Sequence, residues 1–101
     1  MKLEDVFRTR TAARLLDLLL ASPDRVYTQA MLVSRLGLDK RTVRDAVNRL
    51  AALGALDVDA RFGMKLVSLD TESALGRALQ VFYRSLSDIR QQQTHVNGRE
   101  Q

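Results

Sequence analysis

Apolar residues recur at helical spacing on both sides of a glycine near the middle of the chain. The stripe before Gly37 repeats every three to four residues, as one face of a short helix does, and consists of Met31, Leu32, Val33 and Leu36. The stripe after Gly37 recurs at the same spacing and covers about one-third of a helix circumference; it consists of Val43, Ala46, Val47, Leu50 and Leu53. The pattern predicts two short helices joined by a tight turn.

The ends of both helices carry residues that start and stop helices. Thr28 is placed to cap the first helix. Asp39 can accept a backbone N–H in the first turn of the second, where its charge also suits the positive end of the helix dipole. Gly54 closes the second helix, because glycine enters the left-handed region without steric cost. Residues 27–54 therefore match the helix-turn-helix pattern.

The polar face of the second helix is rich in arginine. The residues opposite its apolar stripe are Arg41, Arg44, Asp45 and Asn48, flanked by Lys40 and Arg49. Arginine can donate two hydrogen bonds to guanine and asparagine can pair with adenine, as a helix in a major groove requires. A solvated charged face is the alternative. Asp45 could accept from a cytosine amino group, but an ion pair with Arg41 or Arg49 is the favoured interpretation.

The segments before this motif read as one helix and a short extended stretch. Apolar residues at helical intervals predict a single helix over residues 3–21, and Pro23 ends it because proline lacks the N–H and disfavours a helical predecessor. Residues 25–27 are expected to be extended and to form a short strand. Tyr27 is interpreted as a core anchor rather than a ligand contact.

After Gly54 the apolar period changes to two. Residues 55–59 and 64–69 alternate, and residues 60–63 connect them through a glycine, so a β-hairpin is predicted. Arg61 near its tip is expected to reach a minor groove or a phosphate, with an exposed turn arginine as the alternative. Phe62 is either a contact at the tip or a ring that folds back over the hairpin, and the second interpretation is favoured.

The end of the chain predicts a long helix with a narrow apolar seam. Asp70 or Thr71 is expected to cap it. The apolar positions alternate in steps of four and three, which is a heptad pattern: Leu75, Leu79, Phe82, Leu86 and Ile89, followed by Gln93 and Val96. Self-association through this seam is favoured over packing against the same chain. The predicted divisions are residues 1–70 for a DNA-binding domain, 71–93 for a dimerisation helix and 94–101 for a disordered tail.

Composition and charge narrow the class of protein. The chain has 101 residues and no cysteine, which predicts one domain without disulfides or thiolate metal sites. The longest apolar run is far too short to span a bilayer, so a soluble, cytoplasmic protein is expected. The net charge is +4, and all of that excess lies within residues 1–56. A basic half that contains the helix-turn-helix favours a polyanionic partner.

No constellation of residues suggests catalysis. The one histidine, His95, lies in the polar tail, and no serine or threonine has a histidine partner on an ordered element. Asp57 and Asp59 lie two apart on a predicted strand and are interpreted as an exposed pair rather than a catalytic one. We therefore expect no enzyme activity, no cofactor and no metal.

Residues 28–43 and the leucine-rich stretch 50–56 resemble a known group of proteins. The run Leu36-Gly37-Leu38 leading to a capping residue, with Thr42-Val43 opening the next helix, is similar to MarR-like and ArsR-like winged helix-turn-helix regulators. The resemblance covers about residues 9–69. A winged domain followed by one C-terminal helix looks more like small archaeal, plasmid or viral regulators and the compact PadR-like type. The metal-sensing residues of many ArsR-like proteins are absent from the sequence.

The expected fold is mostly α with a small β-hairpin (α+β): a winged helix-turn-helix followed by a coiled-coil-like helix. The expected function is sequence-specific binding of double-stranded DNA by a small homodimeric transcriptional regulator, a repressor. Alternatives are a DNA-organising or plasmid-partition protein of low sequence specificity and a winged-helix protein-interaction module.

Each candidate residue has an expected role in that function. Base contacts are assigned to Arg41, Arg44 and Asn48. Phosphate contacts are assigned to Thr28, Lys40, Thr42 and Arg49. The wing contact is assigned to Arg61, and dimerisation to Leu75, Leu79, Phe82, Leu86 and Ile89.

Overall fold

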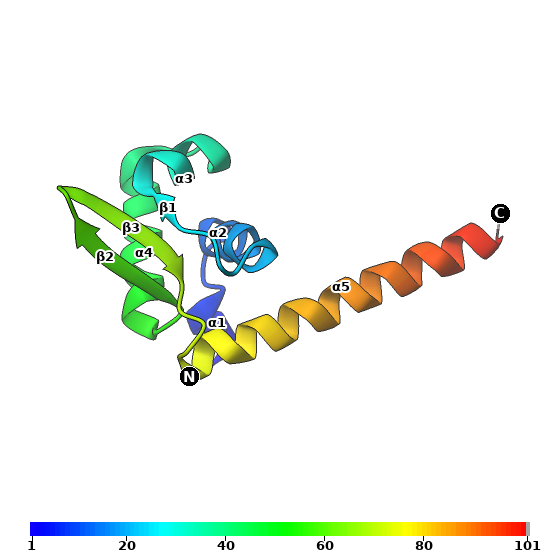
Figure 1. Ribbon diagram of the computed structural model, residues 1–101. Helices are drawn as coiled ribbons and strands as arrows, with labels where there is room; N and C mark the ends of the chain where they lie inside the picture. The colour runs from blue at the N-terminus through cyan, green and yellow to red at the C-terminus, as the bar shows by residue number, and fades with distance from the viewer. Residues whose placement is uncertain (101) are drawn as a thin grey trace.

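The computed structural model describes the backbone of residues 1–100 and the side chains of residues 1–92. Within these residues the chain forms five helices and one three-stranded antiparallel sheet (Figure 1). In chain order the elements are α1 (Leu3–Val6), α2 (Arg10–Ala21), β1 (Tyr27–Thr28), α3 (Gln29–Leu36), α4 (Lys40–Leu53), β2 (Leu56–Arg61), β3 (Met64–Leu69) and α5 (Ala74–Glu100). This mixed α/β arrangement is compatible with a winged helix-turn-helix.

The core lies between α2, α3, α4 and the sheet. Each helix contributes its apolar stripe, so that Leu16 of α2, Leu32 of α3 and Leu50 of α4 are all buried. Tyr27 on β1 is 1% exposed, which confirms its interpretation as a core anchor. The guanidinium of Arg25 lies 5.2 Å from the centre of the Tyr27 ring and covers it from the outside.

The sheet has the order β1-β3-β2. The predicted hairpin is present, with Val58 of β2 opposite Val67 of β3, and Tyr27 of β1 pairs with Val67 on the other side. The extended segment expected at residues 25–27 begins pairing only at Tyr27 and continues to Thr28. A two-residue turn joins β2 to β3, and both of its residues have positive φ. Such a turn matches the twist of the two strands it connects.

The single helix predicted over residues 3–21 is wrong. The helix breaks after Val6, and α2 begins at Arg10 with the Thr9 hydroxyl accepting the Ala12 N–H at 3.0 Å. Threonine competes for backbone hydrogen bonds and therefore starts a new helix here. The break turns the chain so that the Phe7 ring lies 6.2 Å from the ring of Phe82 on α5.

The final helix differs from the prediction at both ends. Neither Asp70 nor Thr71 caps it: the Ser73 hydroxyl accepts the Gly76 N–H at 2.8 Å, while Asp70 accepts the N–H groups of Glu72 and Ser73 in a preceding turn. The helix also continues to Glu100, beyond residue 93, so the backbone of residues 94–100 is helical rather than a tail. The side chains of Gln93, His95 and Val96, together with Gln101, lie outside the described residues. Figure 1 shows α5 projecting far from the body of the molecule.

A close contact joins the end of α4 to the start of α5. The Ser73 hydroxyl donates to the Gly54 carbonyl oxygen at 2.6 Å, and the Asp70 N–H donates to the Ala55 carbonyl oxygen at 2.9 Å. Gly76 is buried beside this turn. A Cβ at Gly76 would lie 1.6 Å from the Asp70 carbonyl oxygen. The first turn of α5 therefore requires glycine.

Replacing Gly76 by alanine tests this junction. Within a helix such a change would ordinarily stabilise by about 1 kcal/mol, but here the methyl group would displace the Asp70 carbonyl. We expect Gly76→Ala to lower the free energy of unfolding by about 1–3 kcal/mol, measured by urea denaturation. Arg77→Ala, an exposed change in the same turn, is the control. An equally stable Gly76→Ala protein would contradict the close contact.

Candidate nucleic-acid interface

Helix α4 separates into a buried and an exposed face. Its hydrophobic stripe packs into the core, where Val43, Val47 and Leu50 are at most 5% exposed. Arg41, Arg44 and Asn48 are exposed on the opposite side. Because one face of a helix cannot turn without the other, burial of the apolar stripe directs these polar side chains outward.

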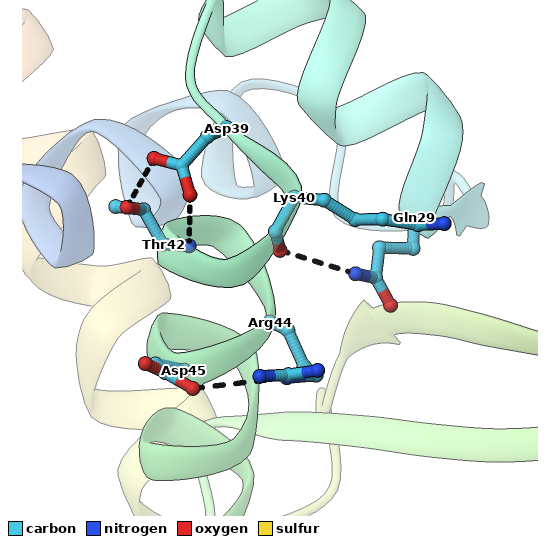
Figure 2. Close-up of polar contacts among 6 residues, drawn as sticks. All are labelled: Gln29, Asp39, Lys40, Thr42, Arg44 and Asp45. Carbon is cyan, nitrogen blue, oxygen red and sulfur yellow. Dashed lines mark hydrogen bonds and ion pairs between the residues drawn. The ribbon is translucent and has the colours of Figure 1, made fainter.

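Asp39 caps α4 as the sequence predicts (Figure 2). One carboxylate oxygen accepts the Thr42 N–H at 3.1 Å, and the other accepts the Thr42 hydroxyl. The Thr42 hydroxyl and then the backbone N–H groups hold the pKa of the Asp39 carboxyl below its ordinary value. The cap therefore keeps a negative charge at the positive end of α4.

Two side chains that sequence reasoning missed hold the helices together. The Gln29 amide donates to the Lys40 carbonyl oxygen at 3.3 Å, linking the first turns of α3 and α4 (Figure 2). The Arg14 guanidinium on α2 donates to the Leu36 carbonyl oxygen at 2.8 Å, at the end of α3. Arg14 lies away from the apolar stripe of its helix, so helical periodicity predicts only a solvent-exposed side chain. Its partner, Leu36, is distant in sequence and could not be inferred from that pattern. These contacts fix the entry to α4.

The three residues predicted to contact bases share one exposed surface. Arg41 and Asn48 have no side-chain hydrogen bond or ion pair within the described residues. The Nε atom of Arg44 lies 3.8 Å from a carboxylate oxygen of Asp45, and Figure 2 shows the two side chains turned toward each other. Both are about half exposed or more, so this pair is weak and readily exchanged for another partner.

The predicted partners of Asp45 are therefore wrong: it pairs with Arg44 rather than with Arg41 or Arg49. Arg49 is one helical turn from Asp45 but donates instead to the carbonyl oxygen of Asp5. That contact depends on the N-terminal segment lying against α4, which the local charge pattern could not reveal.

The four residues predicted to contact phosphates differ in their availability. The Thr28 oxygen accepts the Met31 N–H at 3.2 Å, which leaves its hydroxyl hydrogen free to donate, and the Lys40 side chain is exposed. The Thr42 hydroxyl already donates to Asp39, and Arg49 donates to Asp5. Thr42 and Arg49 also lie toward α2, where they line a groove of about 230 Å³ with Thr9, Thr11, Asp45 and Ala46.

The hairpin carries an ion pair and an exposed ring near its tip. The Nε atom of Arg61 lies 2.7 Å from a carboxylate oxygen of Asp59, two residues earlier on the same face of β2. Phe62 is 95% exposed, so the favoured interpretation that its ring folds back over the hairpin is wrong. The turn gives Phe62 a positive φ of 52°, and this conformation directs the ring away from the strands.

The predicted seam of α5 divides into two parts. Leu79 is buried and Leu75 is partly buried against the core of the same chain. Phe82 and Ile89 are 45% and 48% exposed, and Leu86 is half-buried. Phe82 and Leu86 line an apolar groove of about 330 Å³ between α5 and α2, whose other lining residues are Phe7, Arg10, Ala13, Arg14, Leu16, Asp17, Leu20 and Tyr83.

Across the described residues, no three histidine, cysteine, aspartate or glutamate side chains gather into a group that could hold a metal ion. None of the helices described has both the length and the apolar character needed to cross a membrane.

The lowered pKa of Asp39 gives a testable pH dependence. Because the folded pKa lies below the ordinary 3.8, the charged cap stabilises the fold fully above that pH. This contribution is lost as the pH falls through the folded pKa. Asparagine also caps helices but does not ionise. We expect the melting temperature of the wild type to exceed that of Asp39→Asn at neutral pH and the gap to close in acid.

Circular dichroism across this pH range measures the gap, and Asp24→Asn, at an exposed carboxylate outside the helices, controls for the change of net charge. A gap independent of pH would contradict a stabilising charge at the cap.

The chain is similar in structure to a possible transcriptional regulator from Methanosarcina mazei Go1, with a TM-score of 0.63 and 22% sequence identity. The match covers 94% of this chain and 88% of that chain. The chain matches no protein-family model and no curated protein. This similarity, which extends over nearly the whole chain, shows that the two proteins share a fold.

Proposed function

We propose that this chain is a winged helix-turn-helix transcriptional regulator that binds duplex DNA through α4. The exposed face of α4 carries the proposal: Arg41, Arg44 and Asn48 lie together on it, opposite the apolar stripe that packs into the core. An α-helix fits the major groove, and these side chains can donate to the edges of guanine and adenine. The fold shared with a possible transcriptional regulator supports the same role.

Phosphate contacts would orient the helix on the duplex. Lys40 and Thr28 can donate at the start of α4 and α3 without losing an existing donor contact. Arg49 keeps further N–H donors besides the one directed at Asp5. Thr42 would have to release Asp39 before its hydroxyl could donate, so we assign it a smaller share of the phosphate contacts.

We further propose a homodimer formed through α5. This helix projects from the body (Figure 1) and leaves Phe82 and Ile89 about half exposed, with Phe82 at the edge of the apolar groove next to α2. Burial of these side chains against a second copy would remove apolar surface from water. A dimer would present two α4 helices to successive major grooves about 34 Å apart, and so would select a palindromic site. Occupation of such a site within a promoter would repress transcription.

Arg44→Ala tests the role of α4. Fluorescence anisotropy with a pool of labelled duplexes should give a loss of about 1–3 kcal/mol in binding free energy, because one contact to a base edge is removed. Wild-type binding should also weaken as salt is raised, since bound phosphates release counterions. Arg77→Ala removes the same charge from α5 and is the matched control.

The same measurement separates the alternatives. Binding that falls with salt but is unchanged by Arg44→Ala would indicate a DNA-organising protein that reads no sequence. Absence of binding at low salt would reject the proposal and favour a protein-interaction module.

Leu86→Asp tests the dimer. A carboxylate in the apolar seam would be costly to bury, so light scattering should give the mass of a monomer and binding to a two-site duplex should weaken. Val81→Asp introduces the same charge at an exposed position of α5 outside the seam and should leave the mass unchanged. An unchanged mass for Leu86→Asp would exclude this interface.

A further inference from the structure

The hairpin tip exposes an aromatic side chain at a cost to the fold. Phe62 is 95% exposed and makes little use of its apolar surface within the chain. It is also the one non-glycine residue with positive φ among those described, a conformation that is strained for a bulky side chain. Turns of this kind favour asparagine followed by glycine. Gly63 meets that preference and Phe62 does not, so the fold alone does not account for the ring.

The surroundings of Phe62 indicate the chemistry of its partner. Met64 follows the turn and is 49% exposed, which extends the apolar tip by one side chain. Arg61 precedes the ring, and Lys65 is exposed on the opposite strand. The tip is thus an apolar wedge with a cation on each strand behind it. Phosphates on both sides of a groove would suit these cations while the ring enters between them.

The hairpin points in a direction that would place its tip beside the same duplex that α4 binds. Strand β2 begins two residues after Gly54 and packs against α4. The hairpin therefore runs back along the helix, and Figure 1 shows its turn pointing away from the end of the molecule at which α5 begins. With α4 in a major groove, the tip would lie beside the duplex rather than on the far side of the protein.

We propose that Phe62 is a wedge that enters the minor groove and partly unstacks one base step, bending the duplex. This inference rests on the proposed duplex binding by α4. Apolar side chains inserted between base pairs kink DNA, and the unstacking is offset by the larger surface that the bent duplex brings into contact. Flexible pyrimidine–purine steps bend most readily, so the wedge also adds sequence preference at a position that α4 does not read.

Phe62→Asn separates the wedge from the fold, because asparagine suits the turn. The variant should melt at a higher temperature than the wild type while binding a duplex about tenfold more weakly and leaving it straight. Phe62→Leu keeps an apolar wedge and should retain most of the bend. Val26→Asn, at a position 50% exposed away from the tip, is the control for loss of exposed apolar surface.

The probe is a duplex of about 30 base pairs, selected by the wild-type protein from a random pool, with a donor and an acceptor dye at its ends. Energy transfer reports the bend and anisotropy reports the affinity, with Arg44→Ala measured beside the Phe62 variants. A bend that is present in the wild type and lost only in Phe62→Asn supports the wedge. A straight wild-type complex, or an unchanged bend in Phe62→Asn while Arg44→Ala weakens binding, overturns the wedge and leaves duplex binding by α4 standing. A wild type that binds no duplex at low salt overturns both.

Discussion

Burial of the apolar face of α4 is the constraint on which the rest of the structure depends. Val43, Val47 and Leu50 lie against α2, α3 and the sheet, so the helix cannot rotate without exposing them. Asp39 fixes where the helix begins, and Gln29 ties that beginning to α3. Packing in the core therefore fixes the orientation of the arginine-rich face. A helix that is already fixed loses less conformational entropy when it binds a rigid partner.

The junction between α4 and α5 extends this constraint to the projecting helix. The Ser73 hydroxyl contacts both Gly54 and the first turn of α5, and Gly76 allows the Asp70 carbonyl to approach closely. The direction of α5 is consequently linked to the end of α4 rather than set by a loose connection. In the proposed dimer, this junction would determine the separation of the two α4 helices, and hence the spacing of the half-sites they recognise.

Existing contacts distinguish residues that hold α4 in place from residues whose polar groups face solvent. Hydrogen bonds within the protein are donated by the side chains of Thr42, Arg14 and Gln29. The side-chain donors of Arg41, Lys40 and Asn48 face solvent instead. Arg61 occupies an intermediate position, because its ion pair with Asp59 is short but largely exposed and can be exchanged for a phosphate. The exposed face of α4 and the tip of the hairpin therefore both keep binding capacity that contacts within the protein do not use.

The sequence by itself determined the features that depend on neighbouring residues. The two helices around Gly37, the caps at Thr28 and Asp39, the hairpin and the burial of Tyr27 all follow from local spacing, capping chemistry and periodicity. Only the tertiary structure decided the contact of Arg49 with Asp5 and the division of the α5 seam, because each depends on segments distant in the chain. The break at residues 7–9 has a local cause, the Thr9 cap, which the apolar periodicity of residues 3–21 concealed. The favoured interpretation of Phe62, a ring folded back over the hairpin, was wrong for a related reason: periodicity assigns a strand residue to a face, but Phe62 lies in the turn and has a positive φ in the folded hairpin.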